Sequence, residues 1–210
     1  MAVLLRRFFD ITTALVGLVL LSPLFLLTAV LIKIDSAGPA FFRQERIGRK
    51  FHPFLIYKFR TMTRDAAKGS NHITTSEDSR ITCVGRFLRR FKIDELPQLI
   101  NVLRGEMSIV GPRPEVRRYV EMFQRDYAEL LTVRPGVTNL ASLEYRSEEE
   151  MLARSADPES EYVSKILPAK IALAKESIRR SSLLFDLKLI CLTLFTLFHR
   201  EPRRCGNDAE

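Results

Sequence analysis

The chain has 210 residues, 46% of them hydrophobic, and a formal net charge of +8 from 33 Lys and Arg against 25 Asp and Glu. This length fits one compact domain with appendages, and the charge favours anionic partners: phosphorylated substrates, acidic lipid head groups or nucleic acid. Three cysteines without C-x-x-C spacing and three scattered histidines argue against a disulfide framework and against a zinc site.

The N-terminal segment contains 22 residues without a charge, Ile11 to Ile32. As a helix this run would be roughly 33 Å long, enough to cross the hydrocarbon core of a bilayer and longer than the apolar region of a cleaved signal peptide. Ser22-Pro23 lies at its centre, where proline removes a helical hydrogen bond and breaks the helix.

Basic residues flank this apolar run on both sides, and the positive-inside rule places such residues in the cytoplasm. They are Arg6 and Arg7 before it, and Lys33, Arg43, Arg46, Arg49 and Lys50 after it. We therefore favour a re-entrant helix–break–helix hairpin that enters and leaves by the same face. A single spanning helix remains the alternative.

Two predicted strands follow, Ala40–Arg46 and Phe54–Arg60, with Gly48 in the turn between them, so we expect a β-hairpin. Lys58 and Arg60 share one face of the second strand by its period of two. This face is either solvated or in contact with phosphate. Residues 63–80 are polar and predict a mobile loop.

A short basic helix is predicted at Val84–Arg90, with Arg86, Arg89 and Arg90 clustered on one side. A second helix is predicted from Asp94 to about Leu103, ended by Gly105.

Asp94 and Glu95 are adjacent carboxylates at the predicted helix start, directly after this basic segment. Asp94 is either a plain N-cap, with Glu95 favoured by the helix dipole, or one of a catalytic pair. A carboxylate pair ringed by Arg and Lys suits a metal-chelated phosphate ester or diphosphate.

The loop Met107–Glu115 places a proline on each side of Arg113. Two prolines hold the backbone, so Arg113 would present its guanidinium with little entropy left to lose. An incidental surface arginine is the other interpretation.

Further helices are predicted at Glu115–Leu131, Glu148–Ala153 and Pro158–Ser177, with a short extended piece at Ala141–Tyr145. The last element, Leu183–Phe198, is nearly all apolar but too short in its uncharged part to span a bilayer. Its basic flanks suit a helix in the head-group region of an anionic leaflet, with a buried core helix as the alternative.

These elements predict an α+β fold, mostly helical, membrane-embedded through its N-terminal hairpin and carrying a small β-hairpin. We expect a re-entrant anchor at 1–35, a catalytic domain at 36–200 with the interface helix near 183–198, and a disordered tail at 201–210.

Several motifs in this order resemble the bacterial sugar transferases, the monotopic phosphoglycosyl transferases. They cover most of residues 6–140: Ser22-Pro23 within the apolar run, Gly38 to Gly48, Tyr57 to Met62, Arg80-Ile81-Thr82, Val84 to Arg89, Asp94 to Gln98, Asn101-Val102-Leu103 and Met107 to Pro114. The chain resembles the minimal catalytic form of these undecaprenyl-phosphate sugar phosphotransferases, without the extra N-terminal membrane domain of larger relatives.

The resemblance implies transfer of a sugar-1-phosphate from a UDP-sugar to a polyprenol phosphate such as undecaprenyl phosphate, with release of UMP. This would be the first membrane step of glycoconjugate biosynthesis, at the cytoplasmic face of the bacterial inner membrane. By position, Asp94 matches the nucleophile that forms a covalent aspartyl phospho-sugar intermediate, and Glu95 matches the acidic partner that helps to hold Mg²⁺.

The resemblance also assigns residues that line the site or shape the anchor. Arg89 and Arg113 match residues that hold phosphates, Lys58 and Arg60 fall in a motif lining the same site, and Ser22-Pro23 matches the break in the anchor helix. Relatives commonly carry a Gly-Trp-Ala-Gln-like sequence where this chain has Val137 to Ser142. The sequence therefore leaves the sugar and the pathway open.

Two other functions are alternatives. A non-catalytic membrane-surface module that binds anionic lipids would tolerate Asp94→Asn. A nucleic-acid binder rests only on net charge and lacks an aromatic-studded basic motif, so we expect no nucleic-acid partner. The oligomeric state is left open, a homodimer included.

Overall fold

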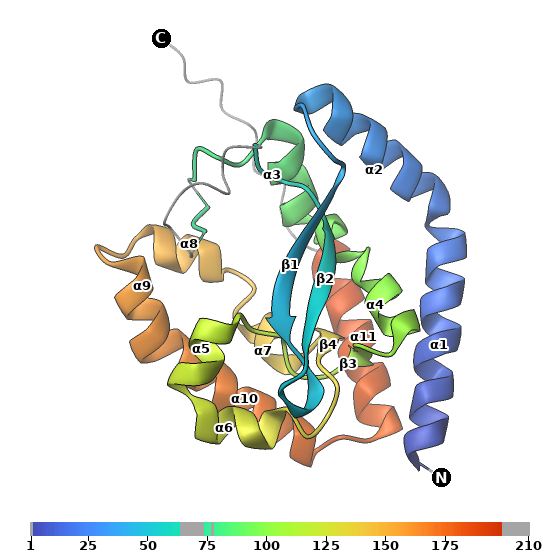
Figure 1. The fold of residues 1–210 in the computed structure, drawn as a ribbon, viewed down its shortest axis with the longest axis vertical. Coiled ribbons are helices and arrows are strands. Elements are labelled where there is room, and N and C mark those ends of the chain that lie inside the picture. Colours follow the sequence, from blue (N-terminus) through green and yellow to red (C-terminus); the bar gives the residue numbers. More distant parts are fainter. Residues whose placement is uncertain (1, 64–73, 77, 199–210) are drawn as a thin grey trace.

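The structure is a computed structural model that describes residues 2–63, 74–76 and 78–198. The predicted tail at 201–210 lies outside the described residues, as does most of the predicted loop at 63–80. Figure 1 shows the first two helices as a bent arm along one side of the molecule, with a long β-hairpin in the middle and a group of shorter helices on the far side.

The N-terminal arm consists of α1 (Ala2–Leu20) and α2 (Ser22–Asp35), which meet at a bend of 60°. Pro23 has no N–H to donate to the carbonyl of Val19, and the Ser22 hydroxyl donates to that carbonyl instead, at 2.8 Å. The predicted break at Ser22-Pro23 is confirmed. Among the described helices none is long and apolar enough to span a membrane alone, although α1 and α2 together pass this test by length and composition.

The predicted hairpin is confirmed to within a residue or two at each end. It pairs β1 (Phe41–Ile47) with β2 (Pro53–Phe59) in antiparallel register, so that Phe41 faces Phe59 and Gln44 faces Ile56. A 3₁₀ turn, Arg49–Phe51, connects the strands.

The next helix, α3 (Cys83–Arg90), was predicted one residue shorter, and the Thr82 side chain caps it by accepting from the Gly85 amide. The helix predicted from Asp94 is different. Residues Ile93–Glu95 form a 3₁₀ turn, and α4 begins only at Gln98 and runs to Arg104. Asp94 lies inside the turn and caps no helix, so the N-cap interpretation is wrong.

The C-terminal end of α4 and the segment after it bring in a second, very small sheet. Gly105 ends α4 in the left-handed region at φ 83°, as predicted. β3 (Ser108–Val110) pairs in parallel with β4 (Gly136–Thr138), a pairing the sequence did not predict. The two backbones are so close that a Cβ on Gly136 would lie 2.0 Å from the Gly111 nitrogen, which explains why glycine stands there.

The predicted helix Glu115–Leu131 is two helices, α5 (Arg117–Met122) and α6 (Gln124–Leu130), broken at Phe123 with φ −118° and ψ 39°. The extended piece expected at Ala141–Tyr145 is wrong. This stretch is a helix, α7 (Leu140–Glu144), because the Asn139 side chain accepts from the Ser142 amide at 2.7 Å and starts it.

The remaining helices largely follow the prediction. They are α8 (Glu148–Ala153), α9 (Pro158–Glu161), α10 (Leu167–Arg179) and α11 (Leu183–Phe198), with a π-helical turn, Tyr162–Ile166, between α9 and α10. One face of α11 is buried at Leu189, while Leu184 and Phe195 are exposed.

Three apolar clusters form the core. One joins the arm to the middle of the chain, because α1 packs against α4 and β3, with Ala14, Leu99 and Leu189 among its members. A second, around Tyr127 and Leu167, unites the later helices, and a third lies under α2 and α3. The fold is therefore α+β and mostly helical.

Candidate active site

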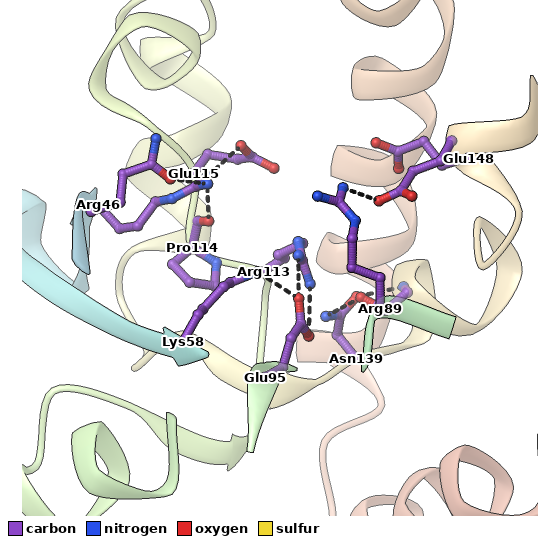
Figure 2. Close-up of polar contacts among 12 residues, drawn as sticks. Arg46, Lys58, Arg89, Glu95, Arg113, Pro114, Glu115, Asn139 and Glu148 are labelled. Carbon is purple, nitrogen blue, oxygen red and sulfur yellow. Dashed lines mark hydrogen bonds and ion pairs between the residues drawn. The ribbon is translucent and has the colours of Figure 1, made fainter. Parts of the chain in front are cut away.

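The carboxylate of Glu95 lies between two cations from other elements. Its Oε1 accepts from Lys58 Nζ of β2 at 2.7 Å and from Arg113 Nη2, in the loop after β3, at 2.8 Å. The 3₁₀ turn Ile93–Glu95 turns the carboxylate toward both, and Figure 2 shows Arg113 reaching over Glu95 from the proline-flanked loop. The structure thus brings together three of the predicted site residues.

Burial and neighbouring charges have opposite effects on the pKa values of Glu95, Arg113 and Lys58. Burial by itself would raise the pKa of the Glu95 carboxyl, but the charges of Arg113 and Lys58 outweigh it and hold this pKa well below its usual range. The charge of Glu95 raises the pKa of the Arg113 guanidinium. Burial lowers the pKa of the Lys58 ammonium, and the charge of Glu95 offsets only part of this effect. Glu95 is therefore ionised and is the counter-ion that keeps two cations in place.

Asp94 lies next to the group of Lys58, Glu95 and Arg113, but these residues do not satisfy all of its hydrogen-bonding capacity. Its side chain is buried, and its Oδ1 has no hydrogen-bond partner among the described residues. Burial raises the pKa of the Asp94 carboxyl, against the nearby charge of Lys58, and the negative charge of Glu95 raises it further. A buried oxygen without a partner costs free energy, so such an atom in a native site indicates a role toward a ligand.

The carboxylates of this site fit a divalent cation only together with a substrate phosphate. No group of three or more His, Cys, Asp or Glu side chains gathers anywhere in the part of the chain that the structure describes. Within the described residues, however, Glu95 Oε2 accepts one hydrogen bond, from Arg113 Nη1 at 3.5 Å, and keeps free lone pairs. Mg²⁺ is commonly held by one or two carboxylates together with substrate phosphates, so Glu95, beside the free oxygen of Asp94, fits such an ion.

Two other predicted phosphate ligands are engaged elsewhere. Arg60 donates to the carbonyls of Ser36 at 2.6 Å and Ala37 at 2.9 Å, so its guanidinium caps the C-terminal end of α2. Arg89, on α3, pairs with Glu149 of α8, and its guanidinium is free to contact a phosphate only if it shares or leaves that partner. Their role in phosphate binding remains a prediction.

A second charged network beside Arg113 was not singled out in the sequence. Arg46 Nη1 of β1 donates to Glu115 Oε2 and to the Pro114 carbonyl, both at 3.3 Å, and Glu115 Oε1 accepts from the Tyr162 hydroxyl at 3.2 Å. Figure 2 shows this network on one side of Arg113, with Arg89 and Asn139 on the other. In the sequence, the position of Glu115 directly after the proline-flanked Arg113 was the signal that could have placed Glu115 near the site.

The stretch that departs from relatives, Val137 to Ser142, enters the same region. Its Asn139 is buried, and its Nδ2 donates to Ser142 Oγ at 2.8 Å. The backbone turn there is set by this side chain, and Asn139 lies on the Arg89 side of the site (Figure 2).

Comparison with known proteins gives a match over nearly the whole chain. The family model described as bacterial sugar transferase matches residues 1–200. A UDP-N-acetylgalactosamine-undecaprenyl-phosphate N-acetylgalactosaminephosphotransferase of Aeromonas hydrophila is 44% identical over 142 residues, 66% of this chain and 34% of that protein.

Two further relatives extend this likeness. A UDP-glucose:undecaprenyl-phosphate glucose-1-phosphate transferase of Escherichia coli (strain K12) is 37% identical over 201 residues, 93% of this chain and 40% of that protein. The exopolysaccharide production protein PSS of Rhizobium leguminosarum bv. phaseoli is 42% identical over 151 residues, 68% of this chain and 75% of that protein. The chain thus spans well under half of the first and second of these three relatives.

Proposed function

Because the chain belongs to the bacterial sugar transferase family, we propose that it transfers a sugar-1-phosphate from a UDP-sugar to undecaprenyl phosphate and releases UMP. The names of the relatives above support both the donor and the acceptor. The observation that carries the proposal is the carboxylate pair itself. Asp94 presents a buried oxygen that has no partner in the described part of the chain, next to Glu95, which two cations hold ionised.

In the first step the Asp94 carboxylate attacks the sugar-bearing phosphorus of the donor. The bond between this phosphorus and the UMP oxygen breaks, UMP leaves with the electron pair, and an aspartyl phospho-sugar remains. Arg113 and Lys58 lie beside the carboxylate pair and stabilise the negative charge that develops on the phosphoryl oxygens.

In the second step the phosphate oxygen of the lipid attacks the same phosphorus, and the bond to Asp94 breaks. The products are a diphosphate-linked lipid and the free carboxylate, so the kinetics are ping-pong. A Mg²⁺ ion held by Glu95 Oε2 and the donor diphosphate would supply further positive charge during phosphoryl transfer.

The acceptor is a lipid, and the surface of the molecule supports a membrane location. The arm formed by α1 and α2 exposes many large apolar side chains, among them Leu20, Leu26 and Ile34, and α11 exposes Leu184 and Phe195. Apolar surface of this extent on a soluble protein is unusual. We place the arm in the cytoplasmic leaflet of the bacterial inner membrane as a re-entrant hairpin, with α11 in the interface.

The test is intact-mass spectrometry of the full chain in detergent with Mg²⁺ and a panel of UDP-sugars, UDP-N-acetylgalactosamine and UDP-glucose included, without acceptor. We expect one donor to give UMP and a phospho-sugar adduct that Asp94→Asn abolishes. The matched control is Asp35→Asn, which removes an exposed carboxylate at the end of α2 and should behave as wild type.

Two outcomes would count against the proposal. An adduct that survives Asp94→Asn would place the nucleophile elsewhere. Undiminished transfer to undecaprenyl phosphate by Asp94→Asn would remove the covalent step altogether.

A further inference from the structure

The structure contains a charged cavity apart from the carboxylate pair. Its volume is about 170 Å³, and none of Lys58, Asp94, Glu95 or Arg113 lines it. The N-terminal half of α1 and the first turn of α11 form it together with Gly111-Pro112 and the turn Thr132 to Arg134. Sites for drug-sized ligands measure about 300–1,000 Å³, so this cavity suits a small group and excludes a nucleotide sugar.

Four arginines line the cavity, and three of them are held by neutral carbonyls. Arg7 donates to Val102 at 2.7 Å and to Leu103 at 3.0 Å, Arg49 donates to Thr132 at 2.9 Å, and Arg134 donates to Gly105 at 2.8 Å. In the described part of the chain these three have no carboxylate partner. The pKa of the Arg134 guanidinium is lowered by burial and by the charges of Arg7 and Arg49.

The cavity also holds two carboxylates, which define the ligand further. Asp10 is satisfied, because its Oδ1 accepts from the Ser108 hydroxyl and from the Ile109 amide, both at 2.9 Å. Asp186 pairs through Oδ2 with the fourth arginine, Arg6, at 2.9 Å. Its Oδ1 is buried and has no partner among the described residues, and the residue is only 6% exposed. With four cations and two carboxylates the lining keeps a net charge of +2, and it offers one acceptor for a hydrogen-bond donor.

Both helices that line the cavity carry exposed apolar side chains close in sequence to the lining residues. Leu4 and Leu5 precede Arg6 on α1 and are 77% and 54% exposed, and Leu183 and Leu184, on the first turn of α11 with Asp186, are 41% and 80% exposed. A free phosphate ion would leave these leucines in water, whereas the acyl chains of a lipid would cover them.

We infer that this cavity binds the head group of an anionic phospholipid. Its phosphodiester contacts Arg7, Arg49 and Arg134, a head-group hydroxyl donates to Asp186 Oδ1, and the acyl chains lie along the exposed leucines. The inference rests on the membrane location proposed above, but not on the transfer chemistry. The bound lipid would join the N-terminal half of α1 to the first turn of α11.

The experiment follows thermal unfolding of the full chain in detergent by far-UV circular dichroism while dihexanoyl phosphatidylglycerol is added. Dihexanoylglycerol, which lacks the phosphate, and inorganic phosphate are the comparison probes. The variants are Arg49→Gln and the double variant Arg49→Gln/Arg134→Gln. Arg125→Gln is the matched control, because it removes the same charge from an exposed site on α6 outside the cavity.

We expect a saturable rise of Tm with phosphatidylglycerol. The half-saturating concentration should rise about tenfold for each arginine removed, as lost charge-assisted hydrogen bonds imply, and should not change in Arg125→Gln. Arg49 is exposed and contributes one contact, so the single variant will fold even where the double variant does not.

Three results would overturn the inference: equal weakening in Arg125→Gln, equal binding of dihexanoylglycerol, or saturation by inorganic phosphate at or below the concentration needed for the lipid. The first would show attraction by net charge alone, the second would remove the phosphate contact, and the third would make the cavity a site for free phosphate. Because no donor sugar is present, failure of the transfer chemistry would leave this measurement unaffected. UMP release after a UDP-sugar is added to separate portions of the same preparations reports on the transfer chemistry.

Discussion

Glu95→Gln should lower the free energy of unfolding, whereas Asp94→Asn should leave it unchanged or raise it. Glu95→Gln leaves Lys58 and Arg113 without their shared counter-ion, which sits at 2.7 and 2.8 Å from them. Removing one partner of a buried ion pair costs about 3–5 kcal/mol, and we lower this to about 2–4 kcal/mol because the Arg113 side chain is 29% exposed to solvent. For a chain of this size that corresponds to a Tm lower by about 5–15 °C.

Asp94→Asn should leave stability unchanged or raise it by up to about 1 kcal/mol at neutral pH, since a neutral amide is less costly to bury than an unpartnered carboxylate. The pH dependence follows from the raised pKa of Asp94. A group whose pKa is raised by folding stabilises the protein below its unfolded pKa and loses that contribution as the pH rises through the folded value. The difference in free energy of unfolding between Asp94→Asn and wild type should therefore grow as the pH is raised from about 4 through the pKa of Asp94 in the folded protein.

The assay is thermal unfolding by far-UV circular dichroism, because the chain has no Trp to report by fluorescence. Both variants should lose UMP release, so activity alone does not distinguish them. Equal destabilisation by the two substitutions would refute the assignment of Glu95 as the structural counter-ion and Asp94 as the free carboxylate.

Three further outcomes are expected. The acid limb of the pH profile of kcat/KM should lie above the ordinary Asp pKa of about 3.9, because the Asp94 carboxyl has a raised pKa; a limb at or below that value would contradict its role as the nucleophile. Gly136→Ala should destabilise the fold by more than about 3 kcal/mol in thermal unfolding, since its Cβ would meet the Gly111 backbone at 2.0 Å, whereas Gly17→Ala, which meets only the end of the Leu99 side chain at 3.1 Å, should cost far less. Ser22→Ala/Pro23→Ala should straighten the arm and expose the N-terminus to a membrane-impermeant label from the outer side, and an unchanged labelling pattern would show that the bend does not depend on these residues.

The sequence predicted those parts of the fold that depend on local signals. Proline at position 23 and glycine at position 105 act on the backbone within one helical turn, and the hairpin shows its alternation over seven residues in each strand. Both kinds of signal can be read without knowing what lies nearby in space.

The parts that were missed depend on distant partners. Three residues of β3 are too few to show a period, and they become a strand only because β4, some 28 residues later, presents glycine at the contact. Asn139 has the ordinary preference of asparagine for a helix start, but from the sequence we expected an extended piece at Ala141–Tyr145. In both cases a tertiary or side-chain contact decides between two locally acceptable conformations.

Three of the predicted site residues meet in the structure, whereas two of the predicted phosphate ligands, Arg60 and Arg89, have other partners. Lys58, Glu95 and Arg113 meet as the family resemblance implied, whereas the charge pattern alone left Lys58 either solvated or in contact with phosphate. They meet because a buried carboxylate needs cations and the chain offers them from two other elements. The sequence does not show which arginines bind phosphate and which bind other groups of the protein. Arginine binds carbonyls and carboxylates with the same donors that bind phosphate, so sequence alone does not assign Arg60 or Arg89.

The position of Arg60 explains how the arm and the site are connected. Arg60, the residue directly after β2, donates to the carbonyls of Ser36 and Ala37 in the turn after α2, while Lys58, two residues earlier in β2, holds Glu95. Gly38 lies against the Arg60 guanidinium, with φ 123° and no room for a Cβ, so the turn after α2 is shaped around this contact. A single strand therefore fixes the distance between the end of the apolar arm and the carboxylate pair. If the arm lies in the membrane as proposed, β2 also sets the height at which the site meets the phosphate of its lipid acceptor.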